Sequence, residues 1–295
     1  MRVLVTGAGG LLAAAIIREF EAAGATAVAL DRRALDLTEA DRVQRAVGEA
    51  GADVVVNCAA YNDVDGAEAD AQAALALNAF AVRTLARATR ESGSGLVHYS
   101  TDFVFDGNQT RLYVEDDQPN PGGAYAASKL LGEWFALEHP GAYVLRVESL
   151  FGEPGPGGSR GGSLRGILTK IESGDTAPVF VDRTITPGYT ADIALATRRL
   201  VQERAAAGLY HCVNSGPTTW AEVAAEAARL LGLPLRMRPI TLESVQLLAK
   251  RPRYSALSNA KLAAAGISMP TWQDALSRHL AHHARAVSQG QAGRG

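Results

Sequence analysis

The fold of this chain is decided by its opening stretch, Arg2-Val3-Leu4-Val5-Thr6-Gly7-Ala8-Gly9-Gly10-Leu11-Leu12-Ala13. Residues 2–6 form an apolar run typical of a strand, and a helical pattern follows to about Gly24. Gly7 and Gly10 let the backbone approach a pyrophosphate, and Ala13 takes a third small position, where the helix packs close to the strand. The amides at the helix N-terminus would then face the phosphates. The stretch therefore predicts the first strand-turn-helix unit of a dinucleotide-binding fold.

Four further strand-like runs alternate with helical patterns over residues 26–147; they cover 26–30, 53–57, 95–99 and 142–147. This alternation predicts an α/β fold of the Rossmann type, with a doubly wound parallel sheet and right-handed crossovers. Ligands of such sheets gather beyond the carboxyl ends of the strands. We therefore expect functional residues in the segments that follow each strand.

The composition of the sequence changes after Phe151, where residues 152–162 are rich in glycine and proline. This segment reads as a mobile loop over the site or as a plain connector. We expect residues 1–150 to form the dinucleotide-binding domain and residues 185–215 to return to it. Residues 151–184 and 216–286 would form a smaller C-terminal substrate lobe, and 287–295 a tail.

The second strand ends at Asp31, close to the spacing expected for an acidic residue that binds the adenosine ribose. Arg32 and Arg33 follow directly and could receive a 2′-phosphate instead. The sequence therefore predicts a nicotinamide cofactor and leaves NADP and NAD both open. Asp36 follows in a short loop, where it could also be merely solvated.

Composition narrows the class of protein. The chain has 295 residues, 47% of them apolar, and a formal net charge of −2. That charge offers no footprint for nucleic acid or for an anionic membrane. No apolar run approaches the roughly 18 residues of a membrane span, and Cys58 and Cys212 make no disulfide framework. We therefore expect a cytoplasmic protein.

No metal site is predicted. Asp63, Asp65, Glu68 and Asp70 read as a solvated helix start favoured by the helix dipole. His279, His282 and His283 read as a solvated helix face, because one helix offers them no carboxylate or thiolate partner.

Carbonyl-reduction chemistry is indicated by Tyr125-Ala126-Ala127-Ser128-Lys129. If this segment is helical, Tyr125 and Lys129 share one face. An ammonium favours the phenolate and brings the acidity of the phenol toward the working pH. Such a phenol could protonate the alkoxide that hydride addition leaves. Ser100-Thr101-Asp102 arrives at the same sheet edge from the end of the preceding strand and supplies a second hydroxyl.

With these residues assembled, the chain resembles an extended short-chain dehydrogenase/reductase, and within that superfamily the dTDP-4-dehydrorhamnose reductase family. The similarity extends from Met1 to about residue 280. Its most specific carrier is the string Ser100-Thr101-Asp102-Phe103-Val104-Phe105-Asp106-Gly107. The other carriers are Gly7-x-x-Gly10-x-x-Ala13, Asp36-Leu37-Thr38, Asn57-Cys58-Ala59-Ala60-Tyr61, Tyr125-x-x-x-Lys129 with Leu131-Gly132-Glu133, Arg146, Thr184-x-Thr186-Pro187-x-Tyr189-x-x-Asp192, and Arg251-Pro252 with Ser255.

The resemblance implies an enzyme that uses NAD(P)H to reduce the C4 keto group of a nucleotide-activated deoxysugar. It implies Thr101 as the hydroxyl on the keto oxygen, Tyr125 as the proton donor, and Lys129 as the residue that lowers the Tyr125 pKa and holds the nicotinamide ribose. Asp102 would touch the sugar nucleotide. The implied lining of the dinucleotide is Gly7, Gly10, Leu11, Leu12, Asp31, Arg32, Asp36, Leu37, Ala59, Ala60 and Tyr61. A homodimer is compatible with the resemblance.

The chain departs from its family after Arg146. The family usually continues with a Thr-Ser-Trp-like string, whereas this chain has Val147-Glu148-Ser149. Glu148 could accept hydroxyl hydrogen bonds, face a substrate cation, or pair with Arg146. This departure leaves the identity of the sugar open.

Two other functions remain compatible with the sequence. The regulatory subunit of eukaryotic methionine adenosyltransferase resembles the same family and acts through a partner, so a catalytically silent dinucleotide-binding subunit is one alternative. A nucleotide-sugar epimerase or dehydratase, which shares the Tyr-Lys pair, is the other. Retention of Thr101, Tyr125 and Lys129 favours an enzyme.

Overall fold

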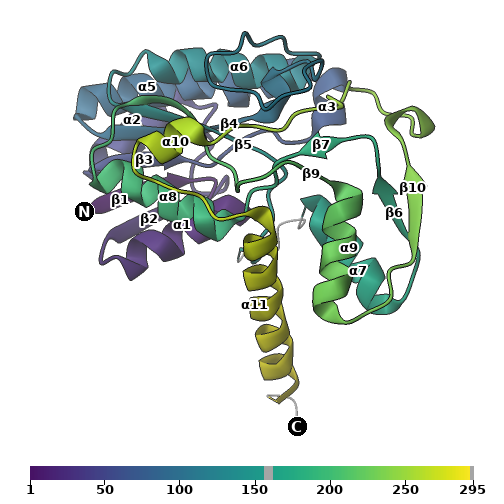
Figure 1. The fold of residues 1–295 in the computed structure, drawn as a ribbon. Helices are drawn as coiled ribbons and strands as arrows, with labels where there is room; N and C mark the ends of the chain where they lie inside the picture. The colour runs from purple at the N-terminus through teal and green to yellow at the C-terminus, as the bar shows by residue number, and fades with distance from the viewer. Residues whose placement is uncertain (156–161, 293–295) are drawn as a thin grey trace.

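The computed structural model describes residues 1–155 and 162–292, and within them a parallel six-stranded sheet forms the centre of the larger part of the molecule (Figure 1). Its strand order is β2-β1-β3-β4-β5-β8. The strands are β1 (Arg2–Thr6), β2 (Thr26–Leu30), β3 (Val54–Asn57), β4 (Gly95–Thr101), β5 (Ala142–Val147) and β8 (Gly208–His211). The order reverses between β1 and β3, which is the switch point where doubly wound sheets bind ligands. The predicted fold class is confirmed.

Helices cover both faces of this sheet (Figure 1). Side chains alternate along β1, so Val3 and Val5 join the apolar cluster with helices α1 and α8, while Leu4 joins the cluster with α2, α5 and α6. The bounds are α1 (Leu11–Ala22), α8 (Thr190–Gln202), α2 (Ala40–Ala50), α5 (Ala81–Ser92) and α6 (Ala124–Leu137). The apolar runs of the strands are thus explained by burial on both sides.

A second group of elements lies beside the carboxyl edge of the sheet (Figure 1). It contains α7 (Gly162–Ser173), β6 (Ala177–Phe180), β7 (Thr184–Ile185), β9 (Thr218–Thr219), α9 (Trp220–Leu231), β10 (Met237–Ile240) and α11 (Trp272–Ala292). Strands β6 and β10 pair in parallel, and β7 and β9 pair antiparallel. The apolar side chains of this group form a core of their own.

Short elements complete the described chain. They are α3 (Val64–Ala69), α4 (Ala71–Leu75), the π-helical turn η1 (Ala76–Phe80), the 3₁₀ turns η2 (Asp102–Val104) and η3 (Leu242–Ser244), and α10 (Ala260–Ala264). Helix α11 continues to Ala292 and so extends through most of the predicted tail, of which residues 293–295 lie outside the described residues. Residues 156–161 of the glycine-rich segment also lie outside them.

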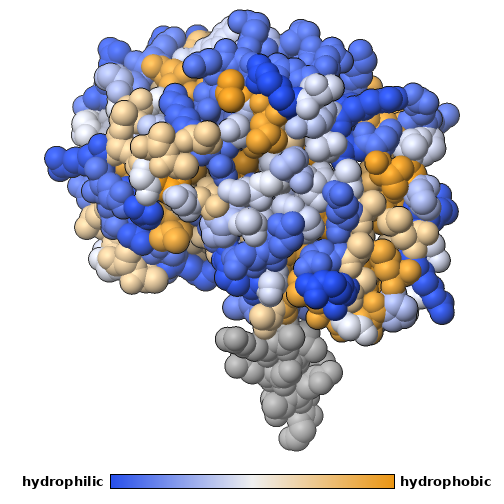
Figure 2. Space-filling model, viewed as in Figure 1, coloured by the Kyte–Doolittle hydropathy of each residue, from blue (hydrophilic) through white to orange (hydrophobic). Residues whose placement is uncertain are grey.

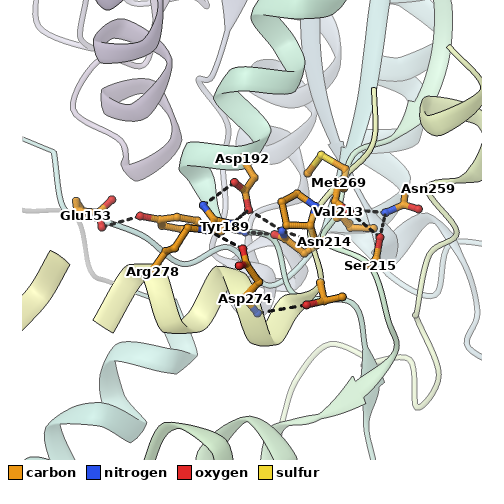
Figure 3. A network of polar contacts seen from close by, with 12 residues as sticks. Glu153, Tyr189, Asp192, Val213, Asn214, Ser215, Asn259, Met269, Asp274 and Arg278 are labelled. Carbon is orange, nitrogen blue, oxygen red and sulfur yellow. Dashed lines mark hydrogen bonds and ion pairs between the residues drawn. The ribbon is translucent and has the colours of Figure 1, made fainter. Parts of the chain in front are cut away.

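An ion-pair network joins α8 to α11 (Figure 3). Arg278 donates to both carboxylate oxygens of Asp192, at 2.8 and 2.7 Å. Asn214 donates to the same carboxylate at 2.7 Å and accepts from the backbone N–H of Tyr189. The two groups of elements are therefore held together by directed hydrogen bonds as well as by packing.

The viewed face of the molecule is mostly hydrophilic, with small hydrophobic areas interspersed (Figure 2). Within the described residues, no helix combines the length and the apolar character needed to span a membrane.

Candidate active site

The predicted cofactor turn lies at the switch point of the sheet. Gly7 has a φ of +69°, and a Cβ at this position would come within 2.7 Å of the backbone N of Ala59. The turn after β1 therefore packs directly on the loop after β3, and only glycine fits there. Gly10 is the N-cap of α1, and as glycine it has no side chain that could cap the helix amides. Among the described residues no side chain bonds these N–H groups, which suits an anion site.

A cavity of about 670 Å³ extends from this turn along the ends of β1 and β2. Its lining includes Gly7, Gly10, Asp31, Arg32, Asp36, Leu37, Ala59, Ala60 and Tyr61, all of them predicted cofactor residues. Leu11 and Leu12 line the adjoining cavity instead. The residues present fit a dinucleotide, because glycine, free helix amides and polar ribose ligands succeed one another along one continuous hollow.

The two acidic residues of this cavity are both tied to their own loops. Asp31 accepts hydrogen bonds from the backbone N–H groups of Arg33 and Ala34, each at 2.9 Å. Asp36 accepts from the N–H and the hydroxyl of Thr38, and these bonds lower the pKa of its carboxyl. Both carboxylates are thus held in place before any ligand binds.

A second cavity, of about 530 Å³, adjoins the first and contains the predicted catalytic residues. Thr101 lies at the end of β4, and Tyr125 and Lys129 lie on one face of α6, as predicted. All three line this cavity together with Asp102, and the exposed fractions of the three catalytic candidates are 5, 8 and 3%. The structure therefore brings together the hydroxyl, the phenol and the ammonium that carbonyl reduction needs.

Helix α6 is held in position by contacts that the sequence did not reveal. Glu68 accepts a hydrogen bond from the N–H of Ala124 at 2.7 Å and so caps the first turn. At Gly132, an added Cβ would stand 2.1 Å from the carbonyl of Asn78, so the helix touches the π-helical turn backbone to backbone. Asn78 also donates to Ser128 at 3.0 Å. These contacts fix the direction in which the catalytic face points.

A buried ion pair ties the same helix to β5. Arg146 donates to both oxygens of the Glu133 carboxylate at 2.8 Å, and both side chains are 2% exposed. Such a pair is a strong positional restraint, because breaking it leaves a buried charge without a partner. Glu148 is therefore not the ion-pair partner of Arg146.

Burial dominates the electrostatics of the candidate catalytic residues Tyr125 and Lys129. Burial raises the pKa of Tyr125, and the hydrogen bond with Thr101 opposes this rise. The ammonium of Lys129 donates to the carbonyl of Tyr99 at 2.6 Å, and burial lowers the pKa of this ammonium to about 8. Tyr125 consequently stays protonated at neutral pH, which is the state that a proton donor requires.

Several cavity residues escaped prediction. Ser149, Leu150, Arg183 and Arg251 line the catalytic cavity alongside Asp102. The guanidinium carbons of Arg183 and Arg251 lie 5.7 and 5.8 Å from the centre of the Phe103 ring. Arg251 belongs to an Arg-Pro motif that supported the family resemblance, but the sequence assigned it no role. The local sequence around Arg183 gave no indication that this residue lines the cavity.

Some of the acidic residues at 63–70 and of the histidines at 279–283 have surroundings that differ from the prediction. Asp63 and Asp70 cap α3 and α4, as solvated helix starts do, but Asp65 pairs with Arg251 at 2.8 Å. His279 is only 9% exposed and contacts Glu153, so the predicted solvated histidine face is wrong at this position. Within residues 1–155 and 162–292, no three metal-ligating side chains come together.

A parallel sheet with a glycine turn at its switch point, a strand-end threonine and a Tyr-x-x-x-Lys helix face defines an extended short-chain dehydrogenase/reductase. Comparison with known proteins gives the family. The RmlD substrate binding domain family matches residues 1–285, and the chain belongs to it.

Its relatives are named as reductases. The chain is 38% identical over 285 residues to the dTDP-4-dehydrorhamnose reductase of Streptomyces griseus, covering 94% of this chain and 92% of the relative. It is 36% identical to a probable dTDP-4,6-dihydroxy-2-methyloxan-3-one 4-ketoreductase of Streptomyces antibioticus, with 94 and 93% covered. A crystal structure of dTDP-4-dehydrorhamnose reductase from Bacillus anthracis in complex with NADP superposes with a TM-score of 0.90 at 30% identity, covering 95 and 99%.

Proposed function

We propose that this chain is an NAD(P)H-dependent reductase of the C4 keto group of a nucleotide-activated deoxysugar, of the dTDP-4-dehydrorhamnose reductase kind. The observation that carries the proposal is the meeting of the buried side chains of Thr101, Tyr125 and Lys129 in one cavity that adjoins the dinucleotide cavity. The names of the relatives give the substrate class.

We assign the cofactor to the cavity between Gly7 and Tyr61. The helix amides after Gly10 would bind the pyrophosphate, and Asp31 or Arg32 would select the group on the adenosine ribose. Leu11 and Leu12 would lie where this cavity meets the catalytic one. When bound, the nicotinamide supplies hydride.

The residues of the chain supply the rest of the chemistry. Thr101 donates a hydrogen bond to the keto oxygen, and Tyr125 delivers a proton to the same oxygen as hydride reaches the carbon. Lys129 would hold the nicotinamide ribose and would place positive charge behind the phenol as the phenolate forms. Asp102, whose Oδ2 is buried without a hydrogen-bond partner in the described structure, contacts the sugar.

We also propose the division of the chain outlined from its sequence, with residues 1–150 and 185–215 carrying the cofactor, 151–184 and 216–286 completing the substrate side, and 287–295 taking no part. The pairing of β8 with β5 supports the return of 185–215. A cytoplasmic location and a homodimer are further proposals, which cell fractionation and light scattering would check.

The test is an initial-rate assay of the purified chain with NADPH or NADH and a panel of dTDP-4-keto-6-deoxysugars. We expect one cofactor oxidised for each 4-hydroxy sugar formed. A nucleotide-sugar epimerase or dehydratase would convert sugar with no net cofactor oxidation. A silent regulatory subunit would bind cofactor and oxidise none with any sugar.

A further inference from the structure

Two carboxyl groups are buried at the ends of neighbouring strands: Asp102 follows Thr101, Glu148 follows Val147, and Thr101 and Val147 are register partners of β4 and β5. Asp102 is 3% exposed and Glu148 is 2% exposed. Glu148 Oε2 accepts from both the backbone N–H and the hydroxyl of Thr186, each at 2.7 Å, and its Oε1 accepts from the hydroxyl of Ser255 at 2.5 Å. The hydroxyl of Ser255 also lowers the pKa of the Asp102 carboxyl, so it lies next to both carboxyl groups. All these partners of Glu148 are neutral.

The charges around the pair do not balance two carboxylates. Arg183, Tyr125 and Tyr254 are the titratable groups that act on the pair, and Arg251 lines the same cavity as Asp102 but pairs with Asp65. The Arg183 guanidinium opposes the rise of the Asp102 pKa, while the two phenols are neutral. Burial raises the pKa of both carboxyl groups, and the neighbouring Asp102 charge raises that of Glu148 further. Two neighbouring buried carboxyl groups beside a single cation favour keeping one proton in the pair.

The hydroxyl of Thr101 has one proton to give, and the Asp102 carboxylate competes for it with the neighbouring Tyr125 oxygen. Thr101 Oγ1 donates to Asp102 Oδ1 at 3.0 Å and accepts from the N–H of Phe103 at 3.2 Å. A carboxylate can only accept, whereas a carboxylic acid carries a donor of its own. An ionised Asp102 therefore keeps the Thr101 proton away from a substrate, and a protonated Asp102 can reverse the bond and donate to Thr101.

We propose that Asp102 and Glu148 share one proton, and that this proton releases the Thr101 hydroxyl to donate to the keto oxygen of the substrate. The inference rests on the proposed reduction. No bond to the substrate is formed or broken by the pair, and its proton stays within it. Glu148, which does not line the cavity, acts through Asp102 and is thus a positioning residue.

The first test reads the proton directly and needs no turnover. Isotope-edited infrared spectra of the full chain with heavy-carbon aspartate and glutamate labels would report a buried protonated carboxyl at neutral pH. We expect its C=O band in the wild type and its loss in Glu148→Gln, because Asp102 alone beside Arg183 ionises. Glu226→Gln is the matched control, since Glu226 pairs with the exposed Arg229 on α9, far from the pair in the sequence, and should leave the band unchanged.

The second test reads the pH dependence of reduction. In Glu148→Gln, kcat should be low in the neutral range and recover as the pH is lowered. The pH at which kcat falls should lie at least about one unit below that of the wild type. Glutamine retains an acceptor for Ser255 or Thr186, so folding should survive, and the melting temperature would verify this. A merely structural role would lower kcat equally at every pH.

The outcomes separate the two proposals. A wild type without the infrared band, or a band that persists in Glu148→Gln, overturns the shared proton whether or not the chain reduces sugars. A band that behaves as expected in a chain with no reductase activity overturns the proposed function and leaves proton sharing in place. If kcat of an active Glu148→Gln variant falls at the same pH as that of the wild type, the link to Thr101 is overturned.

Discussion

Replacing Gly7 by alanine should damage both stability and cofactor binding. The left-handed φ of +69° costs an L-residue about 1–2 kcal/mol. The new Cβ would also stand 2.7 Å from the Ala59 nitrogen, and ordinary contact begins near 3.4 Å, so two backbones must separate by about 0.7 Å. Overpacking of this kind costs about 1–3 kcal/mol. We therefore expect the free energy of unfolding to fall by about 2–5 kcal/mol.

The displaced segments are the two that border the dinucleotide cavity, so cofactor affinity should fall as well. Urea unfolding measures the first effect, and titration of the protein with NADPH, followed by its fluorescence, measures the second. Gly9→Ala is the matched control for stability, because its Cβ would meet nothing within 4 Å, and it should unfold within about 0.5 kcal/mol of the wild type. A Gly7→Ala variant as stable as Gly9→Ala, with wild-type affinity for NADPH, would refute the packing argument.

Three further predictions concern charge. Burial lowers the pKa of Lys129 to about 8, so its ammonium is present below that pH and lost above it. We therefore expect kcat/KM for reduction to decline as the pH rises through about 8, and a value that stays constant to pH 10 would contradict this. Arg146→Met should lower the free energy of unfolding by about 3–5 kcal/mol because it strands the Glu133 carboxylate, and adding Glu133→Gln should recover much of the loss in the same urea experiment. If Arg32 and Arg33 serve a 2′-phosphate, Arg32→Ala should raise the Kd for NADPH about tenfold, or ~1.4 kcal/mol, and leave the Kd for NADH nearly unchanged; equal changes in both would assign these residues to neither cofactor.

The central sheet was predictable because its strands carry their own signal. The continuous apolar runs of β1, β3 and β5 have no exposed face, and glycine follows β1 at once. Strand β10 was missed for the opposite reason. It contains Arg238 and Pro239, shows no alternation, and exists because it pairs with β6, some sixty residues earlier in the chain.

The positions of the candidate catalytic residues were predictable because each follows or lies within a recognisable element. Their environment was not, because it is made by contacts between distant parts of the chain. Glu148 finds Thr186 and Ser255 at separations of 38 and 107 residues. The burial that raises the pKa of Tyr125 likewise depends on the packing of α6 against its neighbours and cannot be read from a five-residue motif.

Transfer of label from cofactor to sugar tests the central claim most directly. The purified chain would be incubated with a dTDP-4-keto-6-deoxysugar and NADPH or NADH deuterated at the transferable position, and the product analysed by mass spectrometry and NMR. The account predicts one deuterium at C4 of the reduced sugar with wild-type protein, and turnover lower by about 10²–10⁴-fold in Tyr125→Phe with cofactor binding preserved. Product without deuterium at C4, or equal turnover in Tyr125→Phe, would contradict it.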